Sequence, residues 1–205
     1  MARGGTVNMQ GIGAQVAKTK SFKFAAKKEL NIFTQRAKNE MLKEFHNHPV
    51  TVEIEGGVTA VNLSNTLGGL AGGGNLFTYL GFDTGSNPTL AVKTYLKESV
   101  RIGAVRTRVS PGRNGRIEAV CTLFYPDMRL LKKVSKLPWE SGKSWIEGME
   151  NGISGFGYYM HRKFEESRSG MGLQTRKKIR QGHFRPTPYF SKIILNFLKR
   201  LGIHR

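Results

Sequence analysis

The sequence contains little cysteine, little proline and few acidic residues. Its 205 residues include one Cys, seven Pro and 14 Asp or Glu. Because Cys121 is the single thiol, the chain cannot form an internal disulfide or a zinc site built on cysteines. Cys121 alternates with apolar neighbours in an expected strand, so we interpret it as a small buried hydrophobe.

Long apolar runs are missing as well. No stretch of about 18 apolar residues is present to cross a membrane. The polar segment after Met1 has no apolar run typical of a signal peptide. We therefore expect a protein of a reducing, aqueous compartment with no membrane partner.

Positive charge is what the sequence has in excess. Lys and Arg number 33, which gives a formal net charge of +19. A potential of this sign attracts polyanions, whether nucleic acid, an anionic membrane or an acidic protein face. Segments 1–45, 99–138 and 139–205 carry +6, +7 and +8, whereas segment 46–98 carries −2. Polyanion contacts are therefore expected outside residues 46–98.

The pattern of apolar residues predicts an α+β fold, in which helices flank a small antiparallel sheet with a protruding hairpin. Apolar residues make up 39% of the chain, enough for a core. We expect a flexible N-terminal arm over 1–20 and a single domain over 21–205. Helices are predicted at 21–45, 88–98, 126–136, 144–151, 158–164 and 189–201, and a short strand at 50–55.

Two further strands, at 100–109 and 116–125, are joined by a Pro-Gly and Asn-Gly segment that favours a hairpin turn. A glycine-rich loop is expected over 56–87, and an exposed basic segment with some extended structure over 165–188. The last helix has an apolar stripe, which could lie on a membrane but is better explained by docking on its own domain or on a neighbouring subunit.

No group of residues indicates an enzyme. Gly68–Asn75 resembles a phosphate-binding loop only superficially, because no Lys and Ser or Thr follow its last glycine. His46 and His48 are better explained as a polar helix end than as metal ligands. Asp127 is better explained as a helix cap than as a catalytic acid. We expect no catalytic residue, no metal and no cofactor.

Basic clusters are the stronger signal. Arginines gather at the tip of the expected hairpin, and a run of cations begins at Arg176. Clustered cations can hold a phosphate backbone without reading sequence. The residues expected to contact nucleic acid or an acidic partner are Arg106, Arg108, Arg113, Arg116, Arg176, Lys177, Lys178 and Arg180.

Two segments stand out by their place in the chain. Gly74-Asn-Leu-Phe-Thr-Tyr-Leu80 follows the first helix, and Phe184-Arg-Pro-Thr-Pro-Tyr-Phe190 introduces the last one. This order resembles the neck and tail-completion proteins of tailed bacteriophages, in which a first helix precedes a Gly-x-Leu segment and a Pro-aromatic segment introduces the C-terminal helix. The likeness covers most of residues 22–201. The stretch 137–148 looks like an insertion, and the glycine-rich loop is unusually long.

The resemblance implies a virion protein that forms a closed ring, sixfold or twelvefold, around the DNA channel. Such a ring joins the capsid portal to the tail, and adaptor, stopper, tail-completion and terminator positions are all compatible with it. The implied partners are portal, adaptor or tail proteins and packaged double-stranded DNA. The apolar residues expected at subunit interfaces are Leu76, Phe77, Tyr79, Phe82, Tyr189, Phe190, Ile194 and Phe197.

A second hypothesis does not depend on the family resemblance. A basic chain of this kind is also expected of a non-specific nucleic-acid-binding protein, such as a ribosome-associated or packaging accessory factor.

Overall fold

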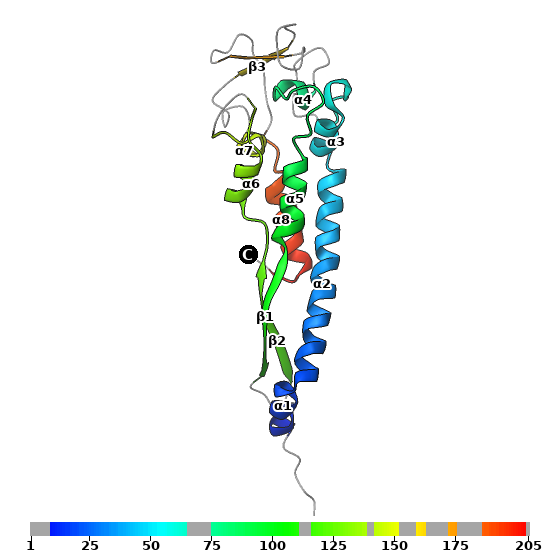
Figure 1. Ribbon diagram of the computed structural model, residues 1–205, viewed down its shortest axis with the longest axis vertical. Coiled ribbons are helices and arrows are strands. Elements are labelled where there is room, and N and C mark those ends of the chain that lie inside the picture. Colours follow the sequence, from blue (N-terminus) through cyan, green and yellow to red (C-terminus); the bar gives the residue numbers. More distant parts are fainter. Residues whose placement is uncertain are drawn as a thin grey trace, which may run out of the picture. The chain divides into compact units, whose positions relative to one another are not determined.

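The computed structural model describes residues 9–64, 75–110, 116–138, 142–151, 159–162, 172–175 and 186–203. These residues form an α+β fold in which helices accompany two antiparallel strand pairs (Figure 1). Within them, no helix combines the length and apolar character needed to cross a membrane.

The chain divides into two compact units rather than the single domain predicted for 21–205. Unit 1 comprises residues 1–37 and 100–125, and unit 2 comprises residues 38–99 and 126–205. The long helix α2, Lys20–Asn47, supplies residues to both units. The α2 helix confirms the prediction for 21–45.

Unit 1 contains α1 (Met9–Lys18), the first part of α2, and the antiparallel pair β1 (Arg101–Val109) and β2 (Ile117–Phe124). The two strands confirm the predicted hairpin, whose turn at 111–115 lies outside the described residues. The register pairs Arg101 with Phe124 and Val109 with Ile117, with an irregularity between Ile102 and Val105.

Residues 9–18 form a helix, so the flexible arm predicted for 1–20 is wrong over that range. The helix is held to the strand pair by its C-terminal end. Thr107 Oγ1 on β1 donates a hydrogen bond to the carbonyl oxygen of Ala17 at 2.7 Å, and Ala17 itself is buried. Small side chains that suggested mobility instead allow close contact with the sheet.

Unit 2 contains the remaining elements. Its helices are α3 (Pro49–Glu55), the short 3₁₀ helix η1 (Gly57–Thr59), α4 (Leu76–Tyr79), α5 (Leu90–Ser99), α6 (Met128–Val134), α7 (Trp145–Asn151) and α8 (Phe190–Arg200). Its strands are β3 (Tyr159–Arg162) and β4 (Gly172–Thr175), which pair antiparallel. Helices α5, α6, α7 and α8 confirm the predictions at 88–98, 126–136, 144–151 and 189–201.

The predicted strand at 50–55 is a helix. Pro49 occupies the first turn of α3, where its missing N–H costs nothing, and His48 Nδ1 accepts a hydrogen bond from the N–H of Val50. Val50 and Ile54, one turn apart, are fully buried, while Val52 between them is exposed. The alternation was misleading because Thr51 and Glu53, which a strand would place on the opposite face, are buried together with Val50 and Ile54.

The predicted helix at 158–164 is also wrong, because residues 159–162 form β3. Tyr159 pairs with Thr175, and Arg162 pairs with Gly172. The partner strand lies within the predicted basic segment 165–188, most of which lies outside the described residues. Strand pairing with this distant segment, not local helical periodicity, satisfies the backbone hydrogen bonds.

Candidate interaction surfaces and their supports

Exposed arginines follow one another on the strand pair of unit 1. Arg106 and Arg108 are two residues apart on β1 and are therefore on one face, and Arg116 stands exposed just before β2. The N–H of Ser110 donates to the carbonyl oxygen of Arg116 at 2.7 Å, which closes the ladder beyond the last strand pair. We call Arg106, Arg108 and Arg116 the arginine face.

One member of the arginine face is paired with an acid. Arg108 Nε donates to Glu118 Oε2 at 2.9 Å across the strand pair. This hydrogen bond, more than any other effect, holds the pKa of Glu118 below its ordinary value. Because the pair lies in solvent, its contribution to stability is small, and the arginine keeps donors free for a further anion.

The other basic residues predicted for anion contact are Arg113, Arg176, Lys177, Lys178 and Arg180, and they lie outside the described residues. Of the predicted set, the described residues Arg106, Arg108 and Arg116 lie together on the hairpin. Arg101, at the far end of β1, lies over the ring of Phe124 with its guanidinium carbon 4.7 Å from the ring centroid.

The residues predicted at subunit interfaces are instead core residues of unit 2. Each exposes between 0% and 8% of its surface in the single chain. A side chain with so little exposed area has almost nothing to offer a second subunit, so the structure assigns a packing role to Leu76, Phe77, Tyr79, Phe82, Tyr189, Phe190, Ile194 and Phe197.

Four of these buried residues, Phe77, Phe82, Tyr189 and Phe190, belong to one cluster of aromatic rings. Phe77 on α4 contacts Phe82, Phe82 contacts Trp145 on α7, and Trp145 contacts Tyr189, with ring centroids 5.5, 6.3 and 6.2 Å apart. Phe45 of α2 stacks against Tyr189. The apolar sides of α2, α4, α7 and α8 thus share one core.

Glu53 is a buried carboxylate that no pattern in the sequence singles out. It is fully buried, its Oε1 accepts from the N–H of Leu76 at 2.7 Å, and its Oε2 accepts from the N–H and the hydroxyl of Ser64 at 2.9 and 2.6 Å. Three donors satisfy the charge where water cannot. Glu53 therefore holds Ser64 and Leu76, one on each side of residues 65–74, in place.

Asn75 reinforces the same place. Its Nδ2 lies 3.1, 3.1 and 2.8 Å from the carbonyl oxygens of Gly57, Val58 and Ala60, and its Oδ1 accepts from the N–H of Thr78 to cap α4. The asparagine of the Gly-x-Leu segment thus has an architectural role. A sequence signal was present, since Asn followed by Thr three residues later favours a helix start.

Another carboxylate, that of Glu150, caps α8. Glu150 Oε1 accepts from the N–H groups of Tyr189 and Ser191, each at 3.0 Å, and its Oε2 accepts from the Ser191 hydroxyl at 2.7 Å. The first N–H groups of a helix have no partner within the helix, and a negative charge near them is favourable. Glu150 therefore fixes the helix that follows the Pro-aromatic segment to α7.

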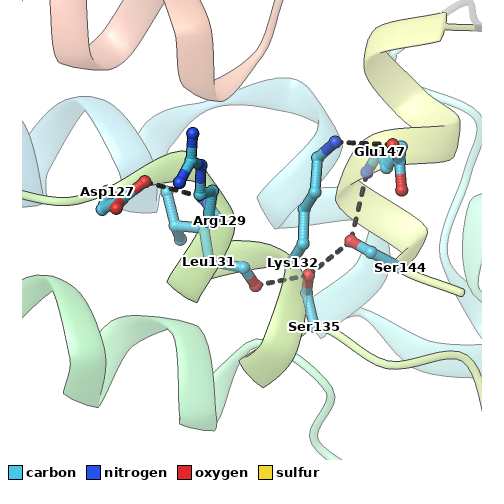
Figure 2. A network of polar contacts seen from close by, with 7 residues as sticks. All are labelled: Asp127, Arg129, Leu131, Lys132, Ser135, Ser144 and Glu147. Atoms are coloured by element: carbon cyan, nitrogen blue, oxygen red, sulfur yellow. Dashed lines mark hydrogen bonds and ion pairs between the residues drawn. The ribbon is translucent and has the colours of Figure 1, made fainter. Parts of the chain in front are cut away.

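Polar contacts also join α6 to α7 (Figure 2). Ser135 Oγ contacts Ser144 Oγ at 2.6 Å and donates to the carbonyl oxygen of Leu131, and Lys132 Nζ donates to Glu147 Oε1. Both serine hydroxyls are engaged with helix ends, because the N–H of Glu147 donates to Ser144 Oγ. Asp127 accepts from the N–H of Arg129, which confirms its predicted capping role.

The two histidines near the end of α2 have structural contacts. His48 caps α3, and burial is the main cause that lowers its pKa, followed by the charge of Lys192. His46 Nδ1 lies 3.7 Å from Glu55 Oε2. Over the described ranges, no three His, Cys, Asp or Glu side chains gather as a metal site would require. Cys121 is half-buried rather than buried as predicted.

Comparison of the chain with known protein families, with curated proteins and with solved structures finds no match.

Proposed function

We propose that the chain is a structural subunit of the neck of a tailed bacteriophage, where copies of it form a ring between the capsid portal and the tail. The observation that carries the proposal is the incomplete burial of unit 1. Its strand pair has arginines on one face, and the apolar side chains Ile102, Val105 and Leu123 are only half-buried. A two-stranded ribbon is marginal alone, and such a ribbon gains stability when a neighbour covers it.

The distribution of acidic residues supports the same proposal. Among the residues that the structure describes, eight acidic side chains accept hydrogen bonds within the chain, namely Glu40, Glu44, Glu53, Glu55, Glu118, Asp127, Glu147 and Glu150. Within the described part of the chain, four of the lysines and arginines are in ion pairs with them. The outward field is therefore cationic, as a subunit facing DNA or acidic neighbours requires.

The segments that carry the family resemblance have a common structural role. Asn75 and Leu76 of the first segment and Tyr189 and Phe190 of the second are all buried in unit 2. The resemblance therefore rests on residues that define the core, while unit 1 is left for contacts between subunits.

Light scattering and electron microscopy of the purified full-length chain, alone and with portal and tail components, test this proposal. We expect ring-shaped oligomers. Changing the exposed Val120 and Phe124 on β2 to Ser should weaken ring formation, whereas the matched control Leu195→Ser on α8 should not. A strict monomer that is absent from purified particles would overturn the proposal.

A second candidate function, non-specific nucleic-acid binding, is favoured by the arginine face. Arg106 and Arg116 are exposed on the strand pair and have no ion pair with any described acid. This function predicts affinity for DNA or RNA that falls steeply as salt is raised, more steeply the more phosphates the protein neutralises. Undetectable binding at physiological salt would eliminate it and leave the neck role standing.

A further inference from the structure

The first half of α2 carries apolar side chains on two opposite sides. On the inner side, Leu30 is half-buried, and Thr34 and Ala37 are buried. On the other side, Phe24 and Ile32 expose 73% and 36% of their surface. With Lys27, Lys28 and Asn31 they line a shallow hollow of about 370 Å³ on the helix. We call these five residues the Phe24–Ile32 surface.

The spacing of this surface is that of a helix-binding seam. Phe24, Lys28 and Ile32 follow one another at intervals of four residues, so they lie along one stripe of the helix. Partner helices are recognised through apolar anchors at this interval. Single exposed apolar residues are ordinary, but a nearly three-quarters exposed Phe aligned with an Ile across a hollow gives a partner two anchors.

The charge around the surface indicates the chemistry of the partner that would fit it. Residues 20–38 contain one acid, Glu29, against the six cations Lys20, Lys23, Lys27, Lys28, Arg36 and Lys38. None of these cations is in an ion pair with an acid of the described residues. Lys27 and Lys28 line the hollow, where their stems extend the apolar area and their ammonium groups add positive charge beside it. A fitting partner has apolar residues on one side and carboxylates beside them.

We propose that the Phe24–Ile32 surface docks an acidic amphipathic helix of a partner protein. A second copy of this surface fits poorly, because the same lysines would face one another across a symmetric contact. Duplex DNA offers phosphates but no apolar side to cover Phe24 and Ile32. The inference rests on unit 1 alone and does not depend on the neck role.

The test uses the full-length chain and a labelled synthetic peptide of Leu, Ala and Glu, about 16 residues or about four helical turns long. Its Leu residues form one stripe, and Glu residues border it. We expect saturable binding by fluorescence anisotropy that weakens as salt is raised. A peptide with Lys in place of every Glu should bind at least about tenfold more weakly.

Substitutions test whether the peptide binds at the Phe24–Ile32 surface. Phe24→Ser and Ile32→Ser should each weaken peptide binding by about tenfold or more, because each removes an apolar side chain that the bound peptide would cover. Leu90→Ser, at an exposed apolar site in unit 2, is the control and should bind as the parent does. Lys27→Glu with Lys28→Glu keeps helix-forming residues and should also weaken binding, which guards against a folding defect of the Ser variants.

Three results overturn the proposal. These are no saturable binding of the acidic peptide, unchanged affinity in Phe24→Ser and Ile32→Ser, and equal binding of the basic peptide. Two further results would also overturn it, because each assigns the surface to a different occupant. Displacement of the peptide by a DNA duplex would make it a nucleic-acid surface, and self-association abolished by Phe24→Ser would make it a subunit interface. Failure of ring formation alone leaves the proposal standing.

Discussion

At the scale of single residues, two of the scarce carboxylates of this basic protein, Glu53 and Glu150, hold backbone segments together instead of pairing with lysines or arginines. Glu53 accepts three hydrogen bonds from groups other than basic side chains, and Glu150 does the same at the start of α8. Their partners are backbone N–H groups and serine hydroxyls. Acids used in this way do not neutralise the surface cations.

Replacing Glu53 with Gln should destabilise unit 2. The amide keeps one acceptor oxygen but turns an NH₂ group toward a donor, so the N–H of Leu76 or of Ser64 loses its partner. Hydrogen bonds to a charged group contribute about 2 kcal/mol each, and an unsatisfied buried donor costs about as much. We expect a loss of about 2–4 kcal/mol in the free energy of unfolding, measured in denaturant. Glu98→Gln, at an exposed position on α5, is the control; an equal effect of the two substitutions would contradict the role of Glu53.

His48 predicts a pH dependence. Its Nδ1 must be unprotonated to accept from Val50, and burial and Lys192 lower its pKa, with Glu150 and Glu44 opposing. Since the unfolded chain binds this proton more readily, the contribution of His48 to stability is complete above about pH 6.5 and is lost as pH falls toward its folded pKa.

The variant His48→Asn isolates this effect. Asn is a good helix cap and does not titrate. We expect thermal stability between pH 8 and pH 5 to fall more in the parent chain than in His48→Asn. The same pH dependence in both would show that other groups are responsible.

At the scale of elements, the sequence predicts periodic and paired segments well. Helices α2, α5 and α8 and the pair β1–β2 have regular apolar spacing or a clear turn signal, and all were predicted. The failures at α1, α3 and β3 have tertiary causes. A hydrogen bond from Thr107 holds the end of α1 against β1. Packing in unit 2 buries Val50 and Ile54 on one side of α3, and β3 pairs with the distant strand β4.

The candidate surfaces show the same division. The sequence could identify Arg106, Arg108 and Arg116, because several cations close together on a hairpin stay at the surface, where water solvates them. The carboxylate contacts could not, because Glu53 meets Ser64 and Leu76 across 11 and 23 residues and Glu150 meets Tyr189 across 39. No local pattern encodes which backbone N–H groups a buried acid will meet.

Helix α8 depends on Glu150 for its start. Tyr189 precedes the helix and supplies no side-chain cap. We expect Glu150→Gln to lower the free energy of unfolding by about 1–2 kcal/mol, as the loss of a helix cap with its charge does. Circular dichroism during thermal unfolding measures this. A stability within about 0.5 kcal/mol of the parent would contradict the capping role.

At the scale of the whole molecule, the two units differ in how they bury apolar surface. The large side chains with less than 2% exposure all belong to unit 2. Both units also expose apolar side chains, which in unit 1 include Phe24, Phe33, Val120 and Phe124. Local stability follows buried apolar contacts. We therefore expect the amides of β1 and β2 to exchange with deuterium faster than those of α3 and α8 in the isolated chain.

Assembly should reduce this difference in exchange rate. If a neighbouring subunit covers the strand pair, exchange in β1 and β2 should slow in the ring while exchange in α8 stays unchanged. Hydrogen exchange with mass spectrometry on monomer and oligomer measures both. Protection of β1 and β2 equal to that of α8 in the monomer would contradict the incomplete burial of unit 1.

The most direct test of the neck role is the position of the chain in a virus particle. Electron microscopy of particles made by the genome that encodes it, with the chain tagged and labelled with gold, locates it. A ring-forming neck subunit predicts label at the junction between capsid and tail. Particles without label, with the chain recovered only as soluble monomer, would contradict that role.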